Sequence, residues 1–218
     1  MRQRNRKHLD ERLDNCSEIY SDKGDILDEE FLSHHPLHME IGCGKGRFIT
    51  TLASLNPDIN YIASEMIANI IVLAAEKAKE MDLGNIRFVS GNVQYMADSI
   101  PEGSIDRIYL NFSDPWPKDR HAKRRLTHKN FLDLYEKLLA PGGEVHFKTD
   151  NRALFDFSLE SFKENGWELS SVTNDLHNSG FEGNVMTEYE ERFSSLGFTI
   201  NRLVARKNRE EQSVSDTL

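Results

Sequence analysis

The sequence predicts a doubly wound α/β fold, in which helices cover both faces of one mostly parallel sheet. Two observations lead to this prediction. Short apolar runs alternate with segments of helical period along most of the chain, and a glycine-rich loop follows the first of these runs. Because parallel strands are joined by right-handed crossovers, such alternation places helices on both sides of the sheet.

Seven apolar runs have the length and composition of strands. They are residues 37–41, 61–64, 86–90, 105–112, 143–149, 167–173 and 198–205. The segment before the last run, residues 174–197, is polar and Gly-rich and shows no clear long helix. We therefore expect a seven-stranded, mostly parallel sheet whose last strand is antiparallel.

Apolar side chains recur at three- and four-residue steps over residues 67–81 and 131–139. This spacing is typical of helices that bury one face. Pro141-Gly142-Gly143 is expected to end the helix that begins near His128.

With 218 residues, of which 38% are apolar, the chain can form one domain with a continuous core and is short for two. We expect a basic N-terminal arm with a first helix over residues 1–35. The main domain should span residues 36–206, and a polar tail, expected to fray, residues 207–218.

The charge of the chain is unevenly distributed. A formal net charge of -9 argues against a protein that coats nucleic acid indiscriminately. Basic side chains nevertheless gather in residues 2–12 and 118–125. An acidic protein with two basic patches suits selective binding of one folded polyanion.

Several features are expected to be absent. Cys16 and Cys43 have no Cys or His neighbours at ligand spacing, so we expect neither a disulfide framework nor a zinc site. His34, His35 and His38 lack a carboxylate at ligand spacing, and we expect no metal. No apolar run is long enough for a membrane span or a signal peptide, which favours a cytoplasmic protein without a membrane partner.

The loop after the first predicted strand reads Glu40-Ile41-Gly42-Cys43-Gly44-Lys45-Gly46. Glycines there allow a tight turn and a close approach of backbone to ligand, as in nucleotide-type cofactor sites. The dinucleotide fingerprint would need a third glycine where Arg47 stands, which disfavours NAD. The spacing instead resembles the first motif of class I methyltransferases, which bind S-adenosyl-L-methionine.

Polar residues follow the other predicted strands at the edge where open α/β sheets bind ligands. Glu65 is placed to accept both ribose hydroxyls, and Asn92 to reach the adenine. Glu40 and Asp114 would add negative charge near the ammonium and sulfonium groups. Each of Glu65, Glu40 and Asn92 could alternatively be a plain strand-end or turn residue.

Asp114 ends the fourth predicted strand, and Pro115 and Pro117 stiffen the loop around Trp116. This arrangement resembles the Asn/Asp-Pro-Pro-aromatic motif of amino-methylating enzymes. Two roles for Trp116 remain open: a platform that stacks the target base, or an anchor for the loop.

A more specific resemblance covers residues 39–205. It rests on residues 111–118 (Asn-Phe-Ser-Asp-Pro-Trp-Pro-Lys), 120–126 (Arg-His-Ala-Lys-Arg-Arg-Leu), 147–151 (Phe-Lys-Thr-Asp-Asn) and 187–190 (Thr-Glu-Tyr-Glu). In these segments the chain resembles the bacterial tRNA (guanine-N7-)-methyltransferases. The resemblance implies a Rossmann-like methyltransferase domain that acts on guanine 46 in the variable loop of tRNA, as a monomer or a homodimer.

The resemblance also implies roles for individual residues. Binding of S-adenosyl-L-methionine would fall to Glu40, Gly42, Gly44, Gly46, Glu65, Asn92 and Asp114. Asp114 would also be the catalytic residue. The substrate would be contacted by Lys118, Asp150, Thr187, Glu188, Tyr189 and Glu190, and the RNA by Arg120, His121, Ala122, Lys123, Arg124 and Arg125.

The chemistry of guanine sharpens two of these roles. N7 carries a lone pair and no proton, so methyl transfer to it needs no general base. We therefore expect Asp114 to align the reactants and to offset the charge that develops on the purine. Asp150 and Glu190 are candidates to accept the two donors of the Watson–Crick edge, with a solvent-facing acid as the alternative for Glu190.

Three other functions are alternatives for this sequence. A class I methyltransferase could act on another RNA atom or on protein, a tRNA-binding protein could have lost catalysis, and a nicotinamide-dependent oxidoreductase could use the glycine loop. The Trp116 loop, the 187–190 segment and the basic run disfavour the first function. The intact glycine loop and Asp114 disfavour the second, and Arg47 disfavours the third. Cys43 is better interpreted as a small packing residue than as a nucleophile.

Overall fold

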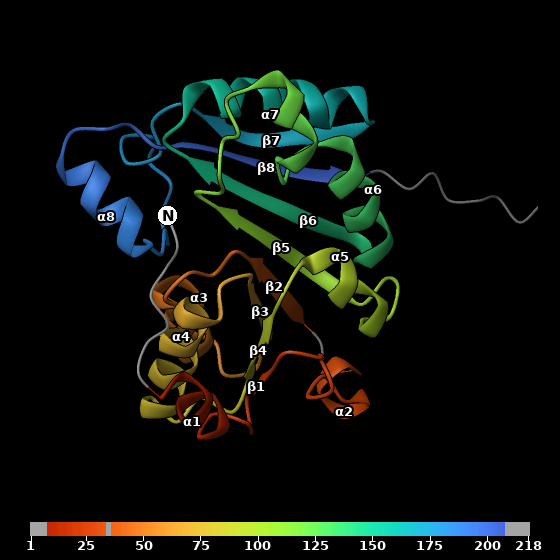
Figure 1. The fold of residues 1–218 in the computed structure, drawn as a ribbon. Coiled ribbons are helices and arrows are strands. Elements are labelled where there is room, and N and C mark those ends of the chain that lie inside the picture. Colours follow the sequence, from red (N-terminus) through yellow and green to blue (C-terminus); the bar gives the residue numbers. More distant parts are fainter. Residues whose placement is uncertain (1–7, 34–35, 208–218) are drawn as a thin grey trace, which may run out of the picture.

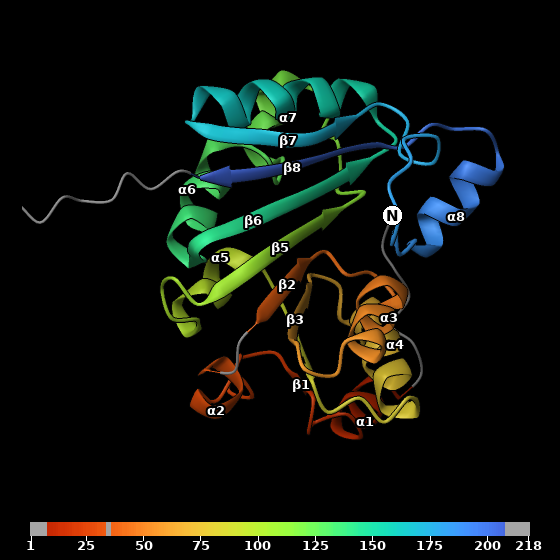
Figure 2. The same ribbon diagram turned by 180° about the vertical axis from the view of Figure 1, so that it is seen from behind.

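The computed structural model describes residues 8–33 and 36–207. The described chain forms one sheet with the strand order β1-β4-β3-β2-β5-β6-β8-β7 (Figures 1 and 2). The strands are β1 (Tyr20–Ser21), β2 (Leu37–Ile41), β3 (Asn60–Glu65), β4 (Ile86–Ser90), β5 (Ile105–Asn111), β6 (Leu139–Thr149), β7 (Trp167–Thr173) and β8 (Asn201–Lys207). Only β8 runs antiparallel to its neighbours within this sheet. The predicted α/β class and the antiparallel last strand are thus confirmed.

The predicted number of strands was wrong, because the described residues form eight strands and not seven. The additional strand, β1, pairs in parallel with β4 and aligns Tyr20 with Phe88. Two residues are too few to show any hydrophobic period, so only the tertiary pairing reveals this strand. Part of the segment that we expected to form an arm therefore belongs to the sheet.

Helices pack on both faces of the sheet, and each face has its own core. The 3₁₀ segments and helices are α1 (Leu9–Asp14), α2 (Glu29–Ser33), α3 (Arg47–Leu55), α4 (Ala68–Glu80), α5 (Val93–Met96), η1 (Ala97–Ser99), η2 (Asp119–Arg124), α6 (Lys129–Leu138), α7 (Arg152–Glu164) and α8 (Glu188–Ser195). Side chains of α2, α5, α6 and α7 bury one face, and those of α3 and α4 bury the other. The connections from β2 to β4 thus lie on one face and those from β4 to β7 on the other, as in a doubly wound fold.

Helix α8 occupies the stretch in which the sequence showed no clear long helix. It extends over eight residues and lies beside the sheet at the carboxyl ends of β5 and β6 (Figure 1). The Thr187 hydroxyl accepts a hydrogen bond from the amide of Glu190 at 2.9 Å and caps this helix. Thr187-x-x-Glu190 is a capping-box pattern, so the sequence did contain a local signal for the start of α8.

Some expectations concern residues outside the described ranges. The basic arm residues Arg2, Arg4, Arg6 and Lys7 lie outside them, as do His34, His35 and the tail from residue 208. Within residues 8–33 and 36–207, no three His, Cys, Asp or Glu side chains form a group suited to a metal ion. In the same ranges no helix has the length and apolar character needed to cross a bilayer.

The three glycines of the loop after β2 have different physical roles. All three have left-handed backbones, with φ of 82° at Gly42, 57° at Gly44 and 80° at Gly46. A Cβ added to Gly46 would lie 2.5 Å from the Cβ of Ala74 in α4, whereas a Cβ on Gly42 or Gly44 would point into open space. Gly46 therefore lets α3 and α4 pack closely, and the other two leave room beside the loop.

We expect Gly46→Ala to destabilise the protein more than Gly142→Ala. Gly142 has nearly the same φ, 79°, but a Cβ there would meet nothing within 4 Å. Both changes cost roughly 1–2 kcal/mol for the left-handed backbone, and the clash with Ala74 adds about 1–3 kcal/mol at Gly46. Chemical denaturation of both variants measures the difference. Equal losses would show that Ala74 does not constrain the loop, and Ala74→Gly should rescue Gly46→Ala alone.

Candidate active site

A cleft of about 210 Å³ lies at the carboxyl edge of the sheet, between the glycine loop and α8. Figure 1 shows these segments side by side at the ends of β2 and β5. The cleft is lined by Glu40, Gly42, Cys43, Gly44, Lys45, Gly46, Arg47, Phe48, Asn111, Phe112, Thr187, Glu188 and Tyr189. Ligands of open α/β sheets bind at this edge, so the cleft is the candidate active site.

Hydrogen bonds from its own backbone hold the glycine loop against β3. The amides of Gly42 and Cys43 both donate to the carbonyl of Ser64, at 2.8 and 2.9 Å. The amide of Gly44 donates to Oε2 of Glu65 at 3.2 Å. The loop is thus fixed in place, while the missing side chains of Gly42 and Gly44 leave space for a ligand to approach the backbone.

Glu40 is the buried acid of the cleft. Its side chain is 1% exposed, and Oε1 accepts a hydrogen bond from Nδ2 of Asn111 at 2.8 Å. Oε2 is buried without a hydrogen-bond partner, and burial raises the pKa of this carboxyl to about 8. A buried acceptor with no partner beside a ligand cleft suits a ligand that brings a donor or a positive charge.

Cys43 also borders the cleft, and its thiol is buried. Burial raises the pKa of this thiol well above its ordinary value, so the thiol stays protonated at neutral pH. A protonated, buried thiol is a packing group and a poor nucleophile.

Glu65 and Asn92 organise backbone near the cleft without lining it. Besides holding Gly44, the Glu65 carboxylate accepts a hydrogen bond from the amide of Ile67 at 3.1 Å. Oδ1 of Asn92 accepts from the amide of Gln94 at 3.0 Å and caps α5. Both residues stand at strand ends, as expected, and Glu65 is the one in contact with the glycine loop.

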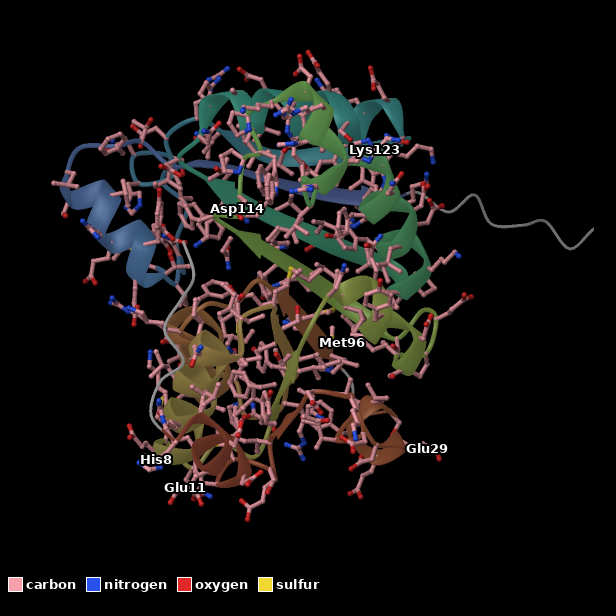
Figure 3. All side chains as sticks on the ribbon, viewed as in Figure 1. His8, Glu11, Glu29, Met96, Asp114 and Lys123 are labelled. Atoms are coloured by element: carbon pink, nitrogen blue, oxygen red, sulfur yellow. The ribbon has the colours of Figure 1, made fainter. Side chains whose placement is uncertain are left out.

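The loop after β5 carries Asp114 and two unusual backbone conformations. Asp114 is exposed at the carboxyl end of β5 (Figure 3), and its carboxylate bonds to no other described residue. Phe112 and Trp116 have left-handed backbones, with φ of 52° and 42°. Such strain at non-glycine residues concentrates at functional sites, because the surrounding structure must hold it.

Trp116 packs inside this loop region and does not line the cleft. The Arg124 guanidinium lies 4.8 Å from the centre of its ring, and the His121 ring meets it edge-on at 5.8 Å. Arg125 donates to the carbonyls of Pro115 and Trp116 at 3.1 and 3.0 Å. Of the two roles left open for Trp116, the structure favours the loop anchor.

The basic run is divided between support and exposure. Arg125 is half-buried, and its guanidinium lies 4.3 Å from the centre of the Phe157 ring in α7. His121 and Ala122 are also half-buried, in the 3₁₀ helix η2. The fully exposed basic residues of this segment are Lys118, Arg120, Lys123 and Arg124.

Ion pairs tie α8 to the opposite side of the cleft. The Glu188 carboxylate lies 3.4 Å from Nζ of Lys45 and 3.5 Å from Nζ of Lys77. Arg47 pairs with Glu191 one turn further along. These side chains are largely exposed, so each pair contributes little to stability by itself. Their common effect is to hold α8 over the glycine loop.

Tyr189 and Phe112 together form an aromatic wall of the cleft. The Tyr189 hydroxyl donates to Oδ2 of Asp150 at 3.1 Å, and its ring lies 5.0 Å from that of Phe112. The Tyr189 ring also stacks on that of Phe193, with 4.0 Å between the ring centres. Among the described residues, Tyr189 is the only hydrogen-bond partner of the Asp150 side chain. Phe112 was not among the sequence candidates.

Glu190 is not the solvent-facing acid that was the alternative for it. Its side chain is completely buried and does not line the cleft. It accepts from Nζ of Lys148 and Nδ2 of Asn184, both at 2.7 Å, and lies 3.2 Å from Nε2 of His177. Sequence reasoning missed Lys148 and Asn184. A Lys within the buried apolar run of β6 was the available signal, since a buried ammonium needs a partner.

Solved structures of similar fold include a 30S ribosomal A1408 methyltransferase from an uncultured bacterium. It matches with a TM-score of 0.61 at 14% identity, over 85% of this chain and 94% of that one. A 16S rRNA methyltransferase matches with a TM-score of 0.60 at 15% identity, over 87% and 95% of the two chains. At such low identity these likenesses support the fold alone.

Sequence relatives are much more similar. A tRNA (guanine-N(7)-)-methyltransferase of Listeria monocytogenes serovar 1/2a is 54% identical over 181 residues, which cover 83% of this chain and 85% of the relative. The protein of the same name from Geobacillus sp. (strain WCH70) is 56% identical over 174 residues, or 80% and 79% of the two chains. Residues 34–203 also match a family described as putative methyltransferases. On these grounds the chain belongs to the family of the tRNA (guanine-N(7)-)-methyltransferases.

Proposed function

We propose that this protein transfers a methyl group from S-adenosyl-L-methionine to N7 of a guanine in tRNA. Relatives that are 54% and 56% identical over at least 80% of this chain carry the name of this activity. The observation in the structure that best supports it is one cleft that joins a glycine loop, a buried acid and an aromatic wall. The resemblance in sequence narrows the proposal to guanine 46 of the variable loop.

The residues of the cleft fit this cofactor. Gly42 and Gly44 leave open space beside the backbone, and the unpartnered Oε2 of Glu40 suits a ligand with an ammonium and a sulfonium group. Glu65 would hold the ribose hydroxyls, and Asn92 the adenine. When bound, the cofactor supplies an electrophilic methyl group.

Guanine N7 is already a nucleophile, so the protein has no proton to remove from it. The task left to its side chains is alignment of the reactants and electrostatic support. Asp114 is exposed at the end of β5 and has no partner among residues 8–33 and 36–207, so its charge is available to the purine as it becomes positive. We assign Asp114 this catalytic role.

Asp150 is the better candidate to select guanine. Within the described part of the chain its side chain bonds only to the Tyr189 hydroxyl, so acceptor capacity remains for the N1 and N2 donors of the base. Glu190 would act indirectly instead. Its buried contacts with Lys148 and Asn184 position Thr187, Glu188 and Tyr189, which line the cleft.

The exposed basic residues Lys118, Arg120, Lys123 and Arg124 would bind tRNA phosphates. They begin four residues after Asp114 in the chain, and Figure 3 places Lys123 near α6 and α7. Arg125 would support the loop from beneath. Because RNA is recognised mainly through shape and backbone, an exposed basic surface suits a folded tRNA. A tRNA substrate also agrees with the cytoplasmic location expected from the sequence.

The activity has a direct test. The protein should transfer labelled methyl groups from S-adenosyl-L-methionine to unmodified tRNA, and base-specific cleavage should map the product to N7-methylguanine. A tRNA with adenosine in place of guanine 46 is the matched control and should not be labelled. A label on another base or atom, or on protein, would favour one of the rival methyltransferase functions, and no label would favour a tRNA-binding protein.

Asp114→Asn should lower kcat strongly while the affinity for S-adenosyl-L-methionine changes less. Loss of one preorganised electrostatic group in an active site costs on the order of 10²–10³ in rate. Single-turnover methylation at saturating cofactor and tRNA measures the effect. Asp119→Asn, an exposed neighbour outside the cleft, is the control. Near-native turnover of Asp114→Asn would contradict the electrostatic role assigned to Asp114.

Lys148→Met should destabilise the fold by about 3–5 kcal/mol, because it leaves Glu190 buried without its cation. The double variant Lys148→Met/Glu190→Gln removes both charges and should recover part of the loss. Lys129→Met is the control, since Lys129 pairs with Asp133 on the surface and should cost less than about 0.5 kcal/mol. Urea denaturation gives the four free energies. If Lys148→Met and the double variant were equally unstable, the loss would not come from the unpaired charge of Glu190.

Cofactor affinity should depend on pH through Glu40. In the free protein, a pKa of about 8 keeps this carboxyl protonated at neutral pH. A cationic ligand favours the carboxylate, so binding should release a proton, and affinity should rise with pH up to about 8 and then level off. Calorimetry in buffers of different ionisation enthalpy counts the proton. Glu40→Gln should abolish the release, and a wild-type affinity independent of pH would contradict this expectation.

A further inference from the structure

The Phe112 ring is an aromatic group of the cleft. It lines the cleft together with Tyr189, and the two ring centres are 5.0 Å apart with planes inclined by 39°. Tyr189 stacks in turn on Phe193, with 4.0 Å between the ring centres. Phe112 is half-buried and Tyr189 is 41% exposed, so part of this wall is accessible.

We propose that Phe112, with Tyr189 beside it, is the stacking platform for the guanine that becomes methylated. The proposal rests on the function proposed above and adds the residue that orients the base. A guanine that leaves its stack in RNA loses contact with its neighbours, and an aromatic side chain restores it. In this role Phe112 is a specificity and orientation residue that touches the substrate.

The structure favours Phe112 over the aromatic residue that the sequence suggested. Trp116 lies under Arg124 and beside His121, and it does not line the cleft. Phe112 precedes Asp114 by only two residues and lies in the same cleft as Gly42 and Gly44. A base on this platform would therefore share the cleft with the methyl donor.

The backbone of Phe112 is strained, so the position of its ring is maintained at a cost in conformational energy. A left-handed conformation is unfavourable for a residue with a bulky side chain, and φ is 52° here. Its amide donates to the carbonyl of Lys148 at 2.9 Å, which fixes the residue against β6. If the ring had no role in the cleft, a glycine at position 112 would adopt this backbone conformation with less strain.

Tyr189 connects the platform to the recognition of the base edge. Its hydroxyl donates to Asp150 at 3.1 Å, so the carboxylate proposed to select guanine is attached to the same wall. A base stacked on the wall would keep its edges free for Asp150 and for the cofactor side of the cleft. The face and the edge of the guanine would thus be read by neighbouring groups.

A thermodynamic cycle between protein and RNA tests the proposal. Binding of the intact tRNA, and of the same tRNA with an abasic nucleotide at the target position, is measured for the wild type and for Phe112→Leu. Stacking on aromatic side chains accounts for about 1–3 kcal/mol per base, so Phe112→Leu should weaken binding of the intact tRNA roughly 5- to 150-fold. Binding of the abasic tRNA should be unchanged. Phe181→Leu, an exposed aromatic residue that does not line the cleft, is the control and should weaken neither RNA.

Two outcomes would overturn the proposal. Equal weakening of both RNAs would mean that Phe112 only shapes the loop, and no weakening of either would mean that it does not touch the base. If Phe112→Leu does not fold, Tyr189→Leu on the exposed side of α8 carries the same test. Methylation by the wild type separates the two proposals. If the wild type forms the product but Phe112→Leu weakens binding of the intact tRNA no more than that of the abasic tRNA, only the platform is refuted. If the wild type forms no product, the proposed function is refuted.

Discussion

The buried ion pair between Lys148 and Glu190 is the interaction on which the cleft depends. Lys148 stands near the carboxyl end of β6, Glu190 lies in the first turn of α8, and their charged atoms are 2.7 Å apart. Removing two charges from water is costly, so the pair persists only because both partners are further satisfied. Lys148 also donates to Asn184 and to the carbonyl of Val185, while Glu190 accepts from Asn184. The chain from Asn184 to Glu190 is thereby fastened to the sheet.

Two further parts of the site are held through the same residue. The carbonyl of Lys148 accepts the amide of Phe112 and so fixes the strained start of the loop that carries Asp114. On the other side, the ion pairs of Glu188 and Glu191 connect α8 to the glycine loop and α4. The catalytic loop, the aromatic wall and the cofactor loop therefore have a common support at the edge of the sheet. Preorganisation of this kind is what methyl transfer to a ready nucleophile needs most.

Much of the fold and part of the site could be predicted because their signals are local. The alternation of strands and helices, the glycine loop and the strand-end position of Asp114 each occupy a few consecutive residues. Glu40 was recognised as part of the motif, but its unpartnered oxygen depends on burial by distant segments. The two-residue strand β1 carries no period, and α8 was overlooked although Thr187-x-x-Glu190 marks its start.

The sequence by itself determined the α/β class, the family and the set of residue types at the carboxyl edge of the sheet. Tertiary structure alone decided how these residues divide their tasks. It packed Trp116 against Arg124, turned Arg125 inward to support the loop and placed Phe112 in the cleft. It also buried Glu190 against Lys148, which stands 42 residues earlier in the chain. The reason is physical: a residue type fixes which bonds a side chain can make, whereas burial and neighbours from remote segments fix which of them it makes.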